Sequence, residues 1–163
     1  MCDVKQELPV QSVELSDVES TPEIHIQPLE FRQIPELVQL LDQLSTVGEL
    51  NGEQMLKFYN KLNNNHQVYV IVQNQHVTAA ATLLIEEKLL HQNKSVGHIE
   101  DVVVDKKSRG KGLGKLMIQF LLALSQDRGC YKCILDCSTD NTEFYKKCNM
   151  EAKGVEMALY FTQ

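Results

Sequence analysis

The chain has 163 residues, of which 43% are hydrophobic, and this suits one globular domain with a sizeable core rather than a disordered chain. Its formal net charge of −6 argues against a nucleic-acid-binding surface. No apolar run approaches a membrane span and no leader pattern opens the sequence, so we expect a soluble, cytoplasmic protein with reduced cysteines.

Residues 1–22 are predicted to form a solvated acidic tail, because acidic side chains predominate there and two prolines interrupt any period. Residues 23–163 are predicted to form the single folded domain. Pro35 suits the first turn of a helix, and leucines spaced three and four apart continue it. The first elements of the domain are expected to be a short strand and two helices, at residues 24–28, 34–44 and 53–62.

The next part of the chain predicts three consecutive strands, because runs of β-branched and apolar residues alternate with short polar turns. A polar hairpin region at residues 86–94 separates the second strand from the third. Strands that are joined by short turns pair antiparallel, so we expect a three-stranded meander. The strands are predicted at residues 68–72, 77–85 and 96–104.

The third strand leads into the glycine-rich sequence R-G-K-G-L-G, at residues 109–114, and a helix follows as far as Gly129. Glycines at a helix start leave the first backbone N–H groups open, and the helix dipole makes that end electropositive. A pyrophosphate would fit there, with Arg109 and Lys111 adding charge. The alternative is a flexible turn that only needs the positive φ that glycine allows.

Two common phosphate loops do not match this sequence. The P-loop requires Ser or Thr after its Gly-Lys pair, whereas Leu116 follows Gly114 and Lys115. The dinucleotide fingerprint requires G-x-G-x-x-G, but the glycines here are spaced G-x-G-x-G. The pattern that the sequence does contain is R-x-x-G-x-G, formed by Arg109, Gly112 and Gly114.

Beyond the helix, the sequence predicts a buried strand, a short capped helix and a last strand, at residues 131–137, 142–148 and 155–161. The strand, helix and strand around the glycine-rich loop form a crossover unit. The order of elements therefore predicts a mixed α/β (α+β) sheet, in which a mostly antiparallel N-terminal meander is followed by a βαβ crossover.

Acidic side chains interrupt two otherwise apolar strands. Glu100 and Asp101 adjoin three valines, and Asp136 lies within the strand predicted at residues 131–137. Charges on a buried strand are costly unless they are paired or functional, so these acids are candidates for binding and proton transfer. The alternatives are an edge position or ion pairs with the basic loop. Tyr145, on the short helix, is a candidate by context, although a single tyrosine more often packs than catalyses.

Cys130 and Cys133 form an isolated C-x-x-C sequence. A spacing of three within a strand points the two side chains to opposite faces, and no second C-x-x-C is present. We therefore predict structural thiols and no metal site.

Several spaced motifs resemble one family. R-x-x-G-x-G is similar to the coenzyme A pyrophosphate loop of the GNAT acetyltransferase superfamily. Within it, GHIEDVVVD, RGKGLGKLMI, GCYKCILDC, NTEFYKKCNM and GVEM, with LSTVG and IEEKLLH upstream, resemble the glucosamine 6-phosphate N-acetyltransferase family over residues 24–159. The resemblance implies the GNAT acyl-CoA N-acyltransferase fold and a homodimer with its substrate site near the interface. It also implies direct transfer, in a ternary complex, from acetyl-CoA to the amine of D-glucosamine 6-phosphate, on the path to UDP-N-acetylglucosamine.

The resemblance also implies how individual residues would bind the donor. Tyr145 would donate a proton or a hydrogen bond to the departing thiolate, and Asn141 would contact coenzyme A. Independently of the resemblance, acyl transfer needs donors for the reacting carbonyl oxygen, and we expect backbone N–H groups at a bulge in the strand of Val102–Val104 to supply them. The pantetheine arm would run beside Val102, Val103 and Val104, and the pyrophosphate would bind at Arg109, Gly110, Lys111, Gly112, Leu113 and Gly114.

For the acceptor, the resemblance implies that Glu100 and Asp101 bind the sugar and help to take the amine proton. Asp136 is a further catalytic candidate near the amine. Lys88 and His91 match a basic pair that binds the sugar phosphate. The implied acceptor-binding residues are Ser45, Lys88, His91, Glu100, Asp101, Asp136 and Cys137.

One position departs from the family pattern. The family has an arginine a few residues after V-E-M that binds the sugar phosphate, and Tyr160 stands there in this chain. Losing a bidentate phosphate donor would weaken phosphate binding. The alternatives to the implied function are a GNAT enzyme for another amine or a protein N-terminus, and a non-catalytic acetyl-CoA-binding regulator.

Overall fold

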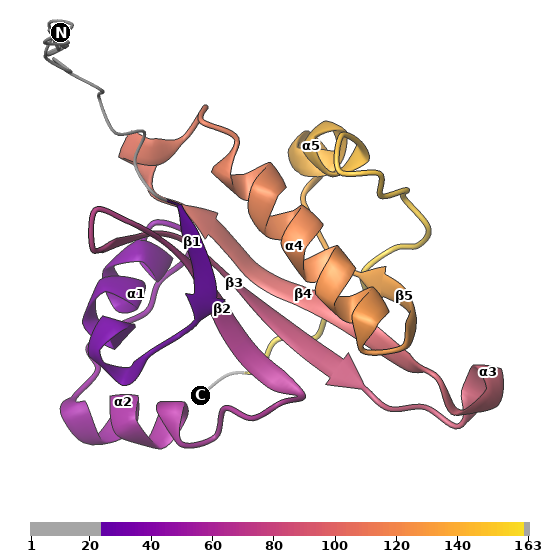
Figure 1. The fold of residues 1–163 in the computed structure, drawn as a ribbon, viewed down its shortest axis with the longest axis horizontal. Helices are drawn as coiled ribbons and strands as arrows, with labels where there is room; N and C mark the ends of the chain where they lie inside the picture. The colour runs from indigo at the N-terminus through magenta and orange to yellow at the C-terminus, as the bar shows by residue number, and fades with distance from the viewer. Residues whose placement is uncertain (1–23, 162–163) are drawn as a thin grey trace, which may run out of the picture.

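The computed structural model describes residues 24–161, so the acidic tail predicted at residues 1–22 lies outside the described residues. Figure 1 shows one twisted sheet with helices on both of its faces. In chain order the elements are β1 (His25–Pro28), η1 (Phe31–Gln33), α1 (Ile34–Leu41), α2 (Gly52–Tyr59), β2 (His66–Gln73), β3 (His76–Glu86), α3 (Leu90–Asn93), β4 (Ser95–Val104), η2 (Lys106–Ser108), α4 (Leu113–Asp127), β5 (Cys130–Ile134), η3 (Thr139–Asn141) and α5 (Thr142–Lys146).

The strands lie in the order β1-β2-β3-β4-β5, and neighbouring strands are antiparallel from β1 to β4. β5 pairs with β4 in parallel, because α4 carries the chain back along the sheet between them (Figure 1). This confirms the predicted mixed sheet, with an antiparallel meander followed by a βαβ crossover.

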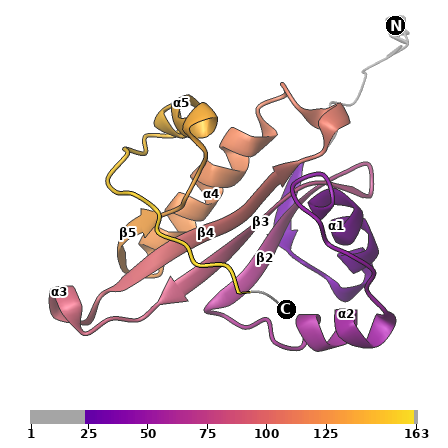
Figure 2. The same ribbon diagram turned by 180° about the vertical axis from the view of Figure 1, so that it is seen from behind.

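The two faces of the sheet carry different helices (Figures 1 and 2), and each face has its own cluster of buried side chains. On one face, α4 packs with residues such as Met117 against Ile71 and its neighbours. On the other face, α1 packs with residues such as Leu37 against Val70. Successive residues of a strand point to opposite faces, which is why Val70 and Ile71 belong to different clusters.

The close approach of α4 to β4 depends on Gly97. A Cβ atom there would lie 2.7 Å from Oγ of Ser125 and 3.1 Å from Sγ of Cys133. The Ser125 hydroxyl is buried and donates to the carbonyl of Leu121 at 2.7 Å. A larger residue at position 97 would collide with Ser125 and Cys133 and would disturb the packing of the C-terminal part of α4 on β4.

β4 contains a β-bulge. The pairs Glu100–Thr82 and Val103–Ala80 leave two residues of β4, Asp101 and its successor, opposite one residue of β3. Asp101 has a φ of 52°, a left-handed conformation that is uncommon for residues other than glycine. The bulge bends the strand and redirects its backbone groups at the position of the predicted catalytic acids.

The structure corrects two predictions at the C-terminal end of the chain. Residues 155–161 form no strand: they are exposed coil, and no strand among residues 24–161 pairs with them. A segment with a strand-like sequence forms a strand only where a sheet edge pairs with it. The predicted buried strand at 131–137 is also wrong in part, because β5 ends at Ile134 and its side chains are half-buried or exposed.

The other differences concern element ends and one hairpin. α1, α2 and α5 end earlier than predicted, at Leu41, Tyr59 and Lys146. The hairpin between β3 and β4 contains α3, at one extreme of the molecule (Figures 1 and 2), where residues 91–93 have φ angles of 52°, 62° and 62°. Within residues 24–161, no helix is both long and apolar enough to cross a membrane.

Candidate active site

Gly110 and Gly112 shape the loop before α4. Their φ angles are 78° and 81°, and a Cβ atom on either residue would meet no atom of the described residues within 4 Å. Gly112 is the N-cap of α4 and offers no side chain to the first turn, so the N–H groups of residues 113–115 have no partner within the helix. Arg109 and Lys111 are exposed beside this end. Open donors at the positive end of a helix dipole, next to two cations, suit a pyrophosphate.

Hydrogen bonds hold the segment that leads into this loop. The Arg109 Nε donates to the carbonyl of Val104 at 3.1 Å and ties the loop to the end of β4. Asp105 accepts from the side-chain amide of Gln43 at 3.1 Å, and the Gln43 oxygen accepts from the Lys106 N–H at 2.9 Å. The bond from Gln43 is the main reason why the pKa of Asp105 lies below its usual value. The end of α1 is therefore fixed to the start of the loop.

β4 has a free backbone edge next to the loop. β5 pairs with β4 only as far as the pair His98–Ile134, whereas β4 continues to Val104. Among the described residues, no strand covers residues 99–104 on that side. Extended ligands with amide groups can hydrogen-bond to such an edge as an added strand does. The pantetheine arm of coenzyme A fits this edge, and its pyrophosphate fits the loop at the end of it.

Gly114 allows α5 to pack against the start of α4. A Cβ atom on Gly114 would lie 3.2 Å from Cζ of Phe144 and 3.5 Å from Cγ2 of Val104. The third glycine of the loop therefore has a packing role in addition to the backbone access that its pattern predicted. This contact places α5, which carries Tyr145, beside the end of β4.

Tyr145 is half-buried, with its ring edge-to-face with Phe144 at a centroid distance of 4.9 Å. Burial, and then the nearby thiols of Cys137 and Cys148, raise the pKa of Tyr145 above its usual value. The phenol therefore stays protonated at neutral pH and is available as a donor. Within residues 24–161, no group accepts a hydrogen bond from its hydroxyl.

The structure brings the predicted acids together near the bulge. Burial raises the pKa of half-buried Glu100, and the nearby carboxylates of Asp101 and Asp136 raise it further. A carboxylate with a raised pKa takes up a proton closer to neutral pH, which suits a base for an amine. Glu156 adds to the same effect, although it comes from the exposed segment that was predicted to be a strand.

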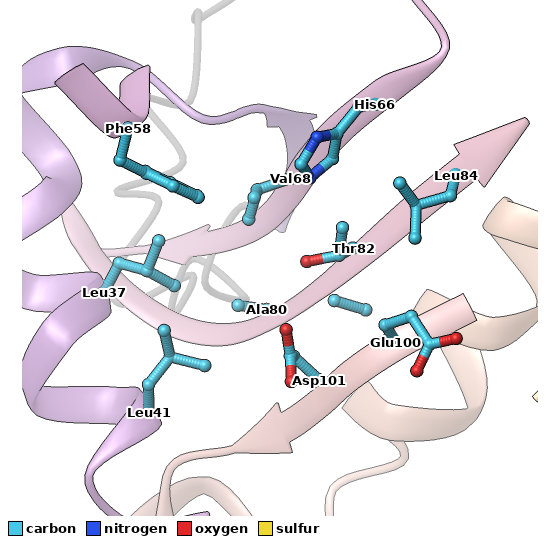
Figure 3. Close-up of a pocket in the computed structure, with 11 residues that line it drawn as sticks. Leu37, Leu41, Phe58, His66, Val68, Ala80, Thr82, Leu84, Glu100 and Asp101 are labelled. Atoms are coloured by element: carbon cyan, nitrogen blue, oxygen red, sulfur yellow. The ribbon is translucent and has the colours of Figure 1, made fainter. Parts of the chain in front are cut away.

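A pocket of about 350 Å³ lies beside Glu100 and Asp101, on the face of the sheet that carries α1 and α2 (Figure 3). Thr82 and His66 also line it, and neither was predicted. Both lie on strands whose apolar patterns indicate only packing, so the strand register was needed to place them beside the acids. The lining residues are Leu37, Leu41, Phe58, His66, Val68, Ala80, Ala81, Thr82, Leu84, Glu100 and Asp101.

The other predicted acceptor residues do not line this pocket. The Lys88 ammonium pairs with Glu86 at 2.5 Å, and the second carboxylate oxygen of Glu86 lies 2.9 Å from His98. His91 stacks on Tyr131 with the ring centroids 4.1 Å apart. The remaining predicted residues are exposed in the loop after α1 and around the start of α5: Ser45, Cys137 and Asn141.

Cys130 and Cys133 are free thiols in the structure. Burial raises the pKa of both, which lowers the fraction of reactive thiolate. Among residues 24–161, no group of three or more His, Cys, Asp or Glu side chains is arranged to hold a metal ion.

Comparisons with known proteins identify the family of this chain. The sequence profile of the Acetyltransferase (GNAT) family matches residues 34–150. A glucosamine 6-phosphate N-acetyltransferase of Arabidopsis thaliana is 40% identical over 129 residues, which cover 76% of this chain and 87% of that protein. Glucosamine 6-phosphate N-acetyltransferase 1 of Oryza sativa subsp. japonica is 36% identical over 165 residues, which cover 97% of this chain and 100% of that protein.

A solved structure has the same fold. The crystal structure of glucosamine-6-phosphate N-acetyltransferase from Arabidopsis thaliana superposes with a TM-score of 0.82 at 36% identity, over 86% of this chain and 99% of that chain. The profile match, the extent of these identities and the common fold all indicate the same family. This chain belongs to the GNAT acetyltransferase family and, within it, to the glucosamine 6-phosphate N-acetyltransferases.

Proposed function

We propose that this enzyme transfers the acetyl group of acetyl-CoA to the amine of D-glucosamine 6-phosphate, giving N-acetyl-D-glucosamine 6-phosphate and CoA. The names of the similar proteins support this acceptor, and acetyl-CoA is the donor that GNAT acetyltransferases use. The observation that carries the proposal is the arrangement at the bulge of β4. An open strand edge leads to the N-terminus of α4, and an acid-lined pocket lies beside it, so a donor and an amine acceptor would meet there.

The donor would lie along β4 and end at the loop. The free edge of residues 99–104 supports binding of the pantetheine arm, and the open N–H groups at Gly112 support binding of the pyrophosphate. Asn141 and Tyr145 would contact coenzyme A from the side of α5. The proposed donor-binding residues are Val102, Val103, Val104, Arg109, Gly110, Lys111, Gly112, Leu113, Gly114, Asn141 and Tyr145.

The chemistry would be direct acyl transfer in a ternary complex. The amine must lose a proton as its nitrogen attacks the thioester carbon, and Glu100 is suited to take that proton because its pKa is raised. Asp101 and Asp136 would hold the amino sugar in place beside it. Backbone N–H groups at the bulge would donate to the carbonyl oxygen as it becomes negative. Tyr145 would donate to the sulfur atom as the carbon–sulfur bond breaks.

The rest of the acceptor would be bound by residues around the pocket. Ser45 and Cys137 would contact the sugar, and Lys88 and His91 would approach its phosphate. Lys88 and His91 lie in the α3 hairpin region, outside the pocket of their own chain. Their proposed role therefore fits best with a pocket that a second copy of the chain helps to build.

A homodimer is part of the proposal. The C-terminal segment exposes Val155, Met157, Leu159, Tyr160 and Phe161 by 78% to 91%. A run of large apolar side chains this exposed favours burial against a second copy of the chain. We place the reaction on the path to UDP-N-acetylglucosamine in the cytoplasm. A GNAT enzyme for another amine or a peptide N-terminus is a less favoured alternative, as is a non-catalytic acetyl-CoA-binding regulator.

A thiol-release assay tests the proposal. Purified protein would be supplied with acetyl-CoA and, separately, with glucosamine 6-phosphate, glucosamine or a panel of peptides with free N-termini. We expect CoA release with the sugar phosphate at a kcat/KM well above that for the other acceptors. Faster release with a peptide would refute the proposed acceptor, and acetyl-CoA binding without release by any acceptor would favour a regulator.

A further inference from the structure

The pocket beside the bulge has an acidic end, which the proposed mechanism uses, and a basic end at His66, which it does not use. Glu100 and Asp101 give one side of it negative charge. Among the described residues that line it, His66 is the only side chain that can carry a positive charge or donate from a ring nitrogen. The remaining lining is apolar apart from the hydroxyl of Thr82. The two ends of the pocket therefore suit opposite ends of an acceptor.

The strand register separates His66 from the acids. His66 pairs with Leu84, and Thr82 pairs with Glu100, so His66 and Glu100 lie on strands two apart and in neighbouring rows of one face. Strand spacing and rise place their Cα atoms roughly 12 Å apart. Figure 3 shows the imidazole on one side of the pocket, the two carboxylates on the other, and Thr82 between them. A hexosamine phosphate has its amine and its phosphate on opposite sides of the ring, as this arrangement requires.

The backbone of His66 is held in place, while its imidazole has no partner among residues 24–161. Its backbone forms a two-way bridge with Asn63, through hydrogen bonds of 3.1 Å and 2.9 Å. Within residues 24–161, no hydrogen bond or ion pair engages its ring. By contrast, the ammonium of Lys88 already pairs with Glu86, and the ring of His91 is stacked on Tyr131. Within residues 24–161 of one chain, His66 is therefore the basic side chain that lines the pocket and has no partner. Lys88 and His91 would reach the phosphate only from a second copy of the chain.

We propose that His66 donates a hydrogen bond to the phosphate of the acceptor and is a specificity-determining residue for phosphorylated amino sugars. This inference rests on the proposed function. It also accounts for Tyr160 at the position where an arginine would bind the phosphate, because a donor inside the pocket replaces one at the exposed C-terminal segment. The carboxylates would repel a dianionic phosphate placed near them, so the same charges orient the amine toward Glu100.

The test compares variants of the full chain on two acceptors. His66→Leu removes the donor, His66→Gln keeps an N–H donor of similar reach, and His76→Leu removes an exposed histidine at the β2–β3 turn as a matched control. We expect His66→Leu to raise the KM for glucosamine 6-phosphate roughly tenfold to a hundredfold, as for loss of a hydrogen bond to a charged group. The KM for unphosphorylated glucosamine should stay within about twofold. Inhibition by inorganic phosphate should weaken in parallel, and His66→Gln should recover part of the loss.

Other outcomes would overturn the inference. An equal rise in KM for both acceptors would make His66 a structural residue, and an unchanged KM for the sugar phosphate would exclude it as a ligand. Loss of phosphate preference in Lys88→Ala, with none in His66→Leu, would assign the phosphate to the hairpin. Melting temperatures show whether each variant folds. If His66→Leu does not fold, the same comparison of the two acceptors is made with His66→Gln. If the parent releases no CoA with glucosamine 6-phosphate, the proposed function fails. The role of His66 can then still be tested with whichever acceptor reacts, by comparing how strongly inorganic phosphate inhibits that reaction in the parent and in His66→Leu.

Discussion

Replacing Tyr145 with phenylalanine removes one hydroxyl and leaves the ring against Phe144. The hydroxyl has no acceptor among residues 24–161, so the variant loses no hydrogen bond of the free protein. We expect the free energy of unfolding to change by less than about 0.5 kcal/mol, which moves the melting temperature of a domain this size by roughly 2 °C or less. The kcat should fall about a hundredfold, at the lower end of general-acid contributions, because a coenzyme A thiolate is already a fair leaving group.

Steady-state kinetics and a melting curve on the same preparation check this prediction. The KM for acetyl-CoA should stay within about twofold, because the lost interaction strengthens only as the thiolate forms. Tyr59→Phe is the matched control, since Tyr59 is also half-buried and edge-to-face with a phenylalanine, Phe31, at 5.6 Å. A Tyr145→Phe enzyme with activity within about twofold of the parent would show that Tyr145 only packs. A large loss of stability would show that its hydroxyl has a structural partner.

Three further experiments test the donor site, the base and the assembly. Gly112→Asp should abolish acetyl-CoA binding in calorimetry, because it puts negative charge where the pyrophosphate would bind, whereas Gly129→Asp, with a similar φ of 77° and equally open surroundings, should bind normally. The raised pKa of Glu100 means that kcat/KM should fall as the pH drops through that pKa and the carboxylate is protonated. In a plot of kcat/KM against pH, Glu100→Gln should remove this decrease at low pH and lower the maximum roughly a hundredfold. An unchanged pH profile would exclude Glu100 as the base. Light scattering at micromolar concentration should show a dimer, and a fully active monomer would contradict the proposed interface.

The central part of the fold could be predicted because its signals are local. Three consecutive valines, then glycines, then an apolar stripe ending before Gly129 define β4, the loop and α4 with little help from distant residues. The shape of β4 could not be predicted in the same way. The left-handed Asp101 depends on how two residues of β4 face one of β3, which is a property of the paired strands.

The acceptor pocket was only half predictable for a related reason. Glu100 and Asp101 stand out because charges interrupt an apolar strand. His66 and Thr82 do not stand out, because a polar residue at a strand end or a threonine within a strand is ordinary. At residues 155–161 a strand was predicted but the structure has coil, because a strand-like sequence does not show whether a sheet edge is there to pair with it.

The early end of β5 also bears on how this protein avoids aggregation. Residues 99–104 carry three valines and unpaired backbone groups, a combination that in other proteins templates pairing between chains. In this fold the bare stretch belongs to an interior strand, because β5 still covers the other end of β4. A strand from another molecule would have to fit into the space beside β5 to pair with these residues. The pantetheine arm is narrower than a strand and can enter that space. The fold can therefore keep the unpaired edge of residues 99–104 for binding its donor and still limit pairing of that edge with strands of other molecules.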